Sequence, residues 1–264
     1  MKRLLSTVAL AHGLLVVAIT ALARWGLGGP PTALLAASWP LWAPLALLLF
    51  PAALWTRRRA PLAAQGAALL VVGAWIGPLL LPSRAVVGDE RLRLMTFNTA
   101  LGALDAAALV ALLDQHEPDI VALQEMVPAL SDPLPAALGE RYPYRVLAAE
   151  GQTIALLSRF PIRQQAWIAA PGAGRAALRV ELDRGGEPLI VYAVHPRPPA
   201  VAWIPQLMIP AGIDARATQA QLLAIAARAE GEAGEVVVLG DFNSIELSPA
   251  IARLGTTLVD AFRA

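Results

Sequence analysis

Cysteine is absent from this chain of 264 residues, and histidine occurs only three times. Without cysteine the chain forms no disulfide, which is compatible with an oxidising compartment. Lysine and arginine total 21 against 20 acidic residues, so the net charge is only +1. A balance this close to neutral supplies no broad basic field, and it disfavours nucleic acid as a partner on electrostatic grounds.

Charged side chains are also missing from three long apolar stretches near the N-terminus of a chain that is 57% hydrophobic, with a mean hydropathy of +0.57. The stretches are about Leu4–Ala23, Thr32–Trp55 and Pro61–Leu81. Each is long enough for the roughly 20 residues that a helix needs to cross the hydrocarbon core of a bilayer. A cleaved signal peptide could account for the first stretch but not for three in succession. We therefore expect residues 1–83 to form an anchor of three transmembrane helices.

Positive charge at the ends of these stretches predicts their orientation. Lys2 and Arg3 precede the first stretch, three arginines at 57–59 join the second to the third, and only Arg24 follows the first. Under the positive-inside rule the N-terminus and the arginine loop are cytoplasmic. Three crossings then place residues 84–264 outside the cytoplasm, in a multi-pass protein of the cell membrane whose first partner is the lipid bilayer. His12 lies within the first stretch, and an interhelical hydrogen bond is favoured over a functional role because these stretches contain no acidic partner.

The second part of the chain has regularly spaced charges and the patterns of a folded domain. Strands are expected at about 91–98, 119–124, 144–149, 153–157, 176–182, 189–194 and 236–239. Helices are expected to begin at Asp105 and Asp214, and a further one at Ser248-Pro249, while 196–213 is expected to be a loop. Strands joined partly by hairpins and partly by helices indicate an α/β sandwich rather than one parallel sheet.

Four of the expected strands end in a polar residue of a type found in catalysis. These residues are Asn98, Glu125, His195, and the pair Asp241 and Asn243 in a Gly-Asp-Phe-Asn turn. Each alone is compatible with an ordinary turn or a solvated side chain. Repetition of the pattern predicts that they share one rim of a sheet, where a rigid scaffold positions functional groups. An acid and an amide one residue apart suit two tasks, orienting a water or metal and binding a phosphoryl oxygen.

Four segments together resemble the endonuclease/exonuclease/phosphatase family, in the order seen there: 94–98 (LMTFN), 118–125 (PDIVALQE), 191–195 (VYAVH) and 240–243 (GDFN). Four motifs in order are far more specific than any single one. The likeness covers about residues 91–264, and the segments 157–161 (LSRFP) and 260–261 (DA) agree with it. With its three-span anchor, the chain further resembles the bacterial membrane branch of VanJ-like and YafD-like proteins.

This resemblance implies a four-layer α/β sandwich, with two stacked mixed sheets flanked by helices, that hydrolyses phosphoesters or phosphoanhydrides with Mg²⁺, for which Mn²⁺ could substitute. Glu125 would be the principal metal ligand, with Asn98 beside it. Asp241 would orient or activate the attacking water, and Asn243 would hold a phosphoryl oxygen. His195 would donate to a non-bridging oxygen as charge builds in the transition state.

One departure from the family pattern concerns the C-terminus. The family normally ends in a Ser-Asp-His motif, whereas this chain stops at Ala264. The other histidines, His12 and His116, do not match that position. The expectation is that the sequence is a C-terminally truncated fragment of the catalytic domain, and that as written it is weakly active or inactive.

The substrate is indicated only by the apolar segment 196–213, which contains Trp203, Ile204 and Met208. It could pack on its own domain, or it could dip into the membrane or contact a lipid tail. Together with the anchor, the second interpretation favours a phosphorylated, lipid-linked substrate over nucleic acid. An extracytoplasmic nuclease and a catalytically impaired membrane protein with a binding role remain alternatives. Nothing in the sequence indicates an oligomeric state.

Overall fold

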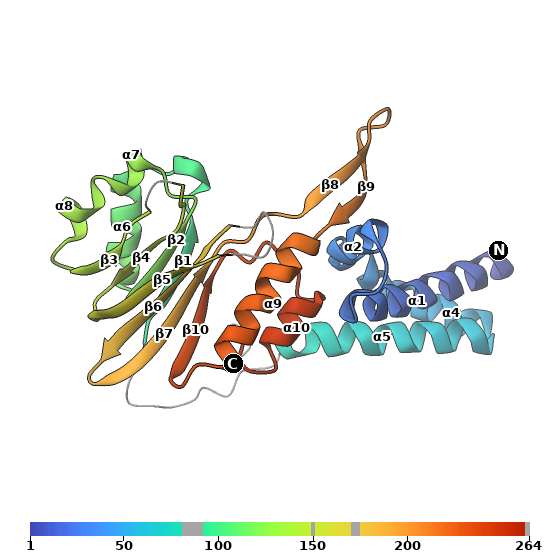
Figure 1. The fold of residues 1–264 in the computed structure, drawn as a ribbon. Coiled ribbons are helices and arrows are strands. Elements are labelled where there is room, and N and C mark those ends of the chain that lie inside the picture. Colours follow the sequence, from blue (N-terminus) through green and yellow to red (C-terminus); the bar gives the residue numbers. More distant parts are fainter. Residues whose placement is uncertain (81–91, 149–150, 170–174, 262–264) are drawn as a thin grey trace. The chain divides into compact units, whose positions relative to one another are not determined.

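A computed structural model describes residues 1–80, 92–148, 151–169 and 175–261 (Figure 1). The described residues divide into two compact units. The helical unit lies within Met1–Val86, Pro199–Ala215 and Ile245–Ala264. The sandwich unit lies within Val87–Pro198 and Arg216–Ser244. The expected boundary between residues 83 and 84 falls outside the described residues.

Most of the helical unit is built from the apolar N-terminal residues. Its elements are α1 (Lys2–Arg24), α2 (Pro30–Ala37), α3 (Trp39–Trp42), η1 (Ala43–Leu45), α4 (Ala46–Thr56) and α5 (Arg59–Leu80). Three helical stretches are long and apolar enough to cross a membrane: Lys2–Arg24, Trp39–Thr56 and Arg59–Gly77.

The second apolar stretch differs from the single helix expected over 32–55. It is divided at Ser38 into α2 and the helical run that begins with α3, because Pro40 occupies the start of a new helix and lacks the N–H that would continue the previous one. Pro44 likewise lies at the start of η1. The stretch therefore contains a short helix, α2, in addition to the candidate span.

Polar side chains join three helical segments of this unit. Gln65 is fully buried, and its amide nitrogen donates to the carbonyl of Ala9 at 2.6 Å and lies 3.2 Å from His12 Nδ1. The Nε2 atom of His12 lies 3.0 Å from the carbonyl of Trp42, where α3 meets η1. Because the Gln65 amide can only donate to Nδ1, the proton of His12 is assigned to Nε2, which donates to that carbonyl. The expected interhelical hydrogen bond of His12 is confirmed.

Two segments that are distant in sequence complete the helical unit. Strands β8 (Ala200–Ile204) and β9 (Ile209–Asp214) pair as an antiparallel hairpin, so the expectation of a loop over 196–213 is wrong. Helix α10 (Pro249–Leu254) begins as expected, with the Ser248 side chain accepting a hydrogen bond from the backbone N–H of Ile251. Leu247, just before it, is buried in the same apolar cluster as Val16 and Trp39.

The sandwich unit contains two mixed sheets of four strands. The first has the order β1-β2-β4-β3, from β1 (Leu94–Asn98), β2 (Ile120–Gln124), β3 (Tyr144–Val146) and β4 (Ala155–Ser158). The second has the order β10-β7-β6-β5, from β5 (Ile162–Ile168), β6 (Ala177–Arg184), β7 (Glu187–Val194) and β10 (Glu235–Gly240). β1 pairs parallel with β2 and β10 parallel with β7, and the other pairings are antiparallel. All of the expected strands are present, and β5 is an additional one.

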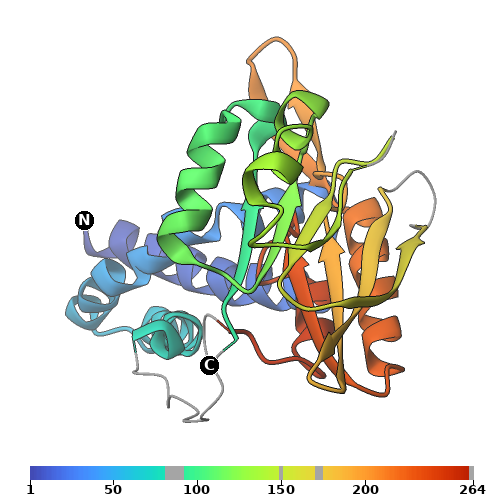
Figure 2. The ribbon, with the colours of Figure 1, turned by 90° about the vertical axis from the view of Figure 1, so that its left-hand side faces the viewer.

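Helices cover the outer faces of the two sheets, so the unit has four layers (Figure 2). They are α6 (Ala106–His116), α7 (Pro128–Ser131), α8 (Leu134–Leu138) and α9 (Arg216–Glu230), with a short turn η2 (Ala100–Gly102). Asp105 caps α6 as expected, accepting a hydrogen bond from the N–H of Ala108 at 2.7 Å. The four-layer sandwich of mixed sheets is confirmed.

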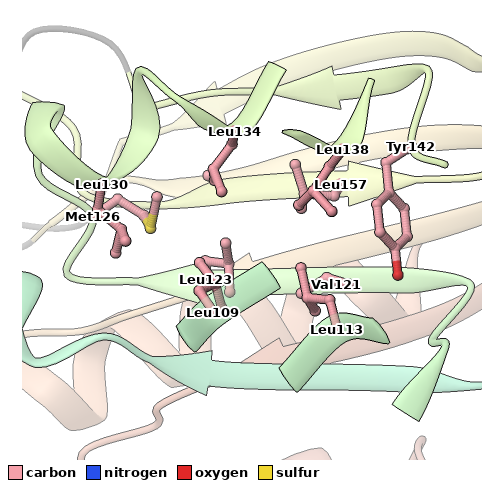
Figure 3. Close-up of a cluster of buried hydrophobic side chains, with 11 residues drawn as sticks. Leu109, Leu113, Val121, Leu123, Met126, Leu130, Leu134, Leu138, Tyr142 and Leu157 are labelled. Carbon is pink, nitrogen blue, oxygen red and sulfur yellow. The ribbon is translucent and has the colours of Figure 1, made fainter. Parts of the chain in front are cut away.

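Burial on both faces explains why the central strands are continuous apolar runs. On β2, Val121 and Leu123 face the helices and pack against Leu109 and Leu113 of α6 (Figure 3). The alternate residues of β2 pack with β6 and β7 between the sheets. On the far side, Ile225 of α9 packs against the outer face of β7.

A polar cluster fastens the end of α9 to the second sheet. The Glu232 carboxylate accepts two hydrogen bonds from Arg179 of β6, at 2.7 and 2.8 Å, and one from the Tyr192 hydroxyl of β7, at 2.5 Å. Hydrogen bonds from Arg179 hold the pKa of Glu232 at about 2, and burial together with the Glu232 charge raises the pKa of Tyr192 to about 12. Because β10 follows directly, this cluster holds the strand that leads to Asp241.

Glu232→Gln is expected to lower the free energy of unfolding by about 2–3 kcal/mol at pH 7, the contribution of charge-assisted hydrogen bonds. The pKa of Glu232 is depressed from 4.5 to about 2, so its stabilisation is complete above pH 4.5 and lost as the pH falls toward 2. Chemical unfolding of the full chain in detergent at several pH values measures this. Glu181→Gln is the matched control, since Glu181 lies 3.7 Å from Arg179, and it should cost less. Equal losses in both variants would contradict the assignment.

Gly240 permits the close approach of β10 to the end of β7. Its φ is 151°, and a Cβ placed there would lie 1.9 Å from the carbonyl oxygen of Val194. Only glycine tolerates both the backbone conformation and the contact. The glycine of the Gly-Asp-Phe-Asn turn is therefore needed for the strand pairing itself.

Gly240→Ala is expected to destabilise the chain by about 3 kcal/mol or more, because strain in φ adds to a backbone clash. Gly185 offers a matched control: its φ is also positive, at 67°, but a Cβ there would meet nothing within 4 Å. Gly185→Ala should cost only the conformational part, about 1–2 kcal/mol. Thermal unfolding of both variants separates the two contributions, and similar losses would show that the Val194 contact is unimportant.

Candidate active site

The register of two parallel strand pairs brings the expected residues to one end of the sandwich unit. Asn98, the last residue of β1, is opposite Gln124, which precedes Glu125. Gly240, the last residue of β10, is opposite Val194, which precedes His195. β10 also contacts β1 and β2, so the ends of both pairs are neighbours. Asn98, Glu125, His195, Asp241 and Asn243 are brought together as the sequence predicts.

Glu125 is held in an unusual backbone conformation at the end of β2. Its φ is 59°, in the left-handed region that few residues other than glycine adopt. Thr99 is buried beside it, and its hydroxyl lies 3.0 Å from the carbonyl of Gln124 and 2.9 Å from that of Glu125. The Thr99 N–H also donates to the Gln124 carbonyl, at 2.9 Å. These contacts fix the direction in which the Glu125 carboxylate leaves the strand.

Asp241 is oriented by hydrogen bonds to both carboxylate oxygens. The Asn98 amide donates to Oδ2 at 3.1 Å, and the Asn243 backbone N–H donates to Oδ1 at 2.9 Å. Asn243 has a φ of 46°, and its side-chain amide donates to the carbonyl of Pro196 at 3.0 Å. This hydrogen bond links the turn that follows β10 to the segment that follows β7. The Asp241 carboxylate itself is partly exposed to solvent.

His195 is completely buried between charges of both signs. Its Nε2 lies 3.5 Å from a Glu125 oxygen and 4.0 Å from an Asp241 oxygen. A guanidinium nitrogen of Arg175 lies within 3.0 Å of both ring nitrogens. Burial, with a further contribution from Arg175, lowers the pKa of His195 below 6.5, and the two carboxylates offset only part of this. The imidazole is therefore neutral at pH 7, with one N–H to donate.

The donor set fits a hard divalent cation. Glu125 and Asp241 supply carboxylate oxygens, and Mg²⁺ in proteins is commonly held by one or two carboxylates together with waters and substrate phosphate. Asn98 already accepts a hydrogen bond from the N–H of Ala100 through its amide oxygen, at 2.9 Å, so its clearest contact is the one to Asp241. Within the described residues, no group of three or more His, Cys, Asp or Glu side chains forms a metal centre by itself.

Two residues of the site were not singled out as site residues from the sequence. Arg175 precedes β6 and is held by α9, where the Gln221 amide donates to its carbonyl. Thr99 is one residue beyond the expected Asn98. No periodic pattern marks either residue, because each reaches the site through a contact between distant segments. His116, at the end of α6, is exposed and makes no part of the site.

Comparison with solved structures finds the same fold in a bacterial sphingomyelinase. Sphingomyelinase C from Streptomyces griseocarneus is 22% identical, with a TM-score of 0.51 over 64% of this chain and 70% of that chain. D. rerio TDP2 in complex with a single-strand DNA product is 21% identical, with a TM-score of 0.48 over 63% of this chain and 66% of that one. No curated protein matches the chain in sequence.

The family model described as Endonuclease/Exonuclease/phosphatase family matches residues 95–261. That range includes all five residues of the candidate site: Asn98, Glu125, His195, Asp241 and Asn243. The chain therefore belongs to the endonuclease/exonuclease/phosphatase family.

Proposed function

We propose that this chain is a membrane-anchored, Mg²⁺-dependent hydrolase of a phosphoester or phosphoanhydride, and that its substrate is lipid-linked. The observation that carries the proposal is the convergence of two carboxylates, a buried neutral imidazole and an arginine at one end of the sandwich unit. Membership of the family supports hydrolysis at a phosphate group by the residues at this end of the sandwich unit.

The side chains divide the work according to their contacts. Asp241, held by two hydrogen bonds and partly exposed, would orient an attacking water and accept its proton. His195 would donate its single N–H to a non-bridging phosphoryl oxygen. Arg175 would place positive charge beside that oxygen as negative charge increases in the transition state. Asn243 would use its second amide hydrogen to hold a further phosphoryl oxygen, since the first is bound to Pro196.

Glu125 would be the principal ligand of the cation, with the Asn98 amide oxygen beside it. When bound, Mg²⁺ would supply Lewis-acid stabilisation of the phosphoryl group and neutralise its charge. The left-handed backbone of Glu125 supports this role, because strain of this kind is retained where a side chain must point in one direction.

The apolar helices support the location and the substrate class. Three helices are long and apolar enough to cross a membrane, and the positive charge at residues 2–3 and 57–59 favours a cytoplasmic N-terminus. The catalytic residues would then lie outside the cytoplasm, tethered next to a lipid surface. Such a tether favours substrates that are themselves membrane-bound.

Glu125→Gln is expected to lower the rate of phosphate or phosphoester release by about 10²–10³-fold, because it removes the proposed metal ligand while keeping the shape of the side chain. The assay uses the full chain in detergent with a prenyl pyrophosphate, a phospholipid and single-stranded DNA, each with Mg²⁺ and with a chelator. Glu140→Gln, at an exposed glutamate in the same unit, is the matched control and should retain activity.

Activity that survives chelation, or that is unchanged in Glu125→Gln, would contradict the metal assignment. Hydrolysis of DNA alone would favour the nuclease alternative. Absence of turnover on all three substrates would favour a binding role.

Single cysteines test the orientation, since the natural chain has none. A membrane-impermeant maleimide added to intact cells should label Glu187→Cys, at an exposed position of the sandwich unit, and should label Arg58→Cys only after permeabilisation. The opposite pattern would reverse the orientation. Labelling of both positions in intact cells would place both outside the cytoplasm, which contradicts a crossing of the membrane by α5 between them.

A further inference from the structure

The β8–β9 hairpin is a small sheet with no other strand beside it among the described residues. Residues 205–208 form the turn, in which the N–H of Leu207 donates to the carbonyl of Ile204 at 3.1 Å. A two-stranded hairpin is only marginally stable in water and exposes unpaired edges on both sides. Something besides its own pairing must therefore stabilise it.

Exposed apolar side chains dominate the hairpin. No charged residue occurs between Arg197 and Asp214. Six large apolar side chains are 38–77% exposed: Val201, Trp203, Ile204, Leu207, Met208 and Ile209. Because successive residues of a strand point to opposite faces, Trp203 and Ile204 make both faces of the hairpin apolar. Protein partners usually cover one face and leave a polar rim, which this hairpin does not have.

The base of the hairpin is fastened to the helical unit. β9 packs on α2, and the contact is so close that a Cβ at Gly212 would lie 2.6 Å from the Cβ of Pro30. α2 lies in the connection between the first two candidate spans, at the end where α1 finishes. Trp25 and Leu27, in the same connection, are also exposed. The hairpin thus begins where the apolar helices would emerge from a bilayer.

The direction of the hairpin agrees with this position. In both ribbon views it extends as an arm away from the helices, and in Figure 1 it runs obliquely to α5 (Figures 1 and 2). If α5 crosses the bilayer, an arm that starts at the end of the helices and leans over them meets the membrane surface. α5 also returns from the arginine loop, so it ends on the side of the bilayer where α2 lies.

We propose that the β8–β9 hairpin lies in the interfacial layer of the bilayer, with Leu207 and Met208 in contact with acyl chains. This inference rests on the proposed membrane anchoring. A bilayer covers both faces of a thin apolar arm at once, and tryptophan such as Trp203 is favoured at that depth. The hairpin starts five residues after His195 in the chain, so the segment that carries this histidine continues directly into the lipid-bound arm. The arrangement deepens the assignment of a lipid-linked phosphate as the substrate.

Depth-dependent fluorescence quenching tests the inference. The full chain carries one fluorophore, attached through Met208→Cys, and is reconstituted in phosphatidylcholine–phosphatidylglycerol vesicles. Quenchers are nitroxide lipids, labelled near the headgroup or near the chain end, and aqueous iodide. Leu70→Cys, at an exposed side chain midway along α5, is the matched deep position, and Glu187→Cys is the aqueous one.

The Met208 label should be quenched best by the shallow nitroxide, at a depth of about 5–10 Å, and should be protected several-fold from iodide relative to the Glu187 label. The Leu70 label should be quenched best by the deep nitroxide. A Met208 label open to iodide, or shielded from iodide and lipid alike, would overturn the inference while leaving the anchor intact. A Leu70 label that no lipid quenches would overturn the anchoring itself, and the hairpin proposal with it.

Discussion

Parallel pairing of β10 with β7, matched by that of β1 with β2, is the constraint on which the candidate site depends. Parallel strands end at the same edge, so the residues that follow them are neighbours whatever lies between them in the chain. Asn98 and Glu125 come from one pair, and His195 and Asp241 from the other. The approach of Gly240 to Val194 leaves no room for a side chain, so the pairing at the end of β10 requires glycine at this position.

Strained backbone and a buried polar side chain occur among the residues that follow these paired strands. Glu125 and Asn243 both have positive φ, and His195 loses all contact with solvent. The positive φ values and the burial of a polar ring each lower the stability of the fold. The apolar layers of the sandwich supply the stability that compensates for this cost. What results is a set of polar groups whose directions are decided before any ligand arrives. Such preorganisation is the usual means by which an active site stabilises a transition state.

The helical unit shows that residues far apart in sequence can belong to one apolar body. In the sequence, most of the sandwich unit lies between the N-terminal helices and the hairpin or α10. In the structure, the hairpin and α10 belong to the same compact unit as those helices. Leu247, seven residues after the end of β10 at Gly240, is buried with Val16 of α1. The apolar body that contains the three candidate spans therefore extends beyond the stretches that hydropathy identifies.

Local pattern was sufficient for most of the sandwich. Continuous apolar runs such as Ile120–Gln124 mark strands that are buried on both faces, and the polar residues that follow these runs are the ones that the structure brings together in the candidate site. The strand β5 was missed because its middle residues are exposed and polar, as suits the edge of a sheet. The segment 196–213 was expected to be a loop but contains the hairpin. Its prolines are compatible with strands, because Pro205 lies in the turn and Pro210 in a strand at a sheet edge, where proline is tolerated.

Four short motifs in the sequence indicated the family, and that resemblance in turn implied the four-layer sandwich. The polar residues that follow the apolar runs indicated the five residues of the candidate site. Three contacts became apparent only in the folded chain: Arg175 faces His195, Asn98 orients Asp241, and an uncharged hairpin packs on α2. These are contacts between segments that local periodicity does not relate. Their partners are selected by strand register and by the space left between packed backbones.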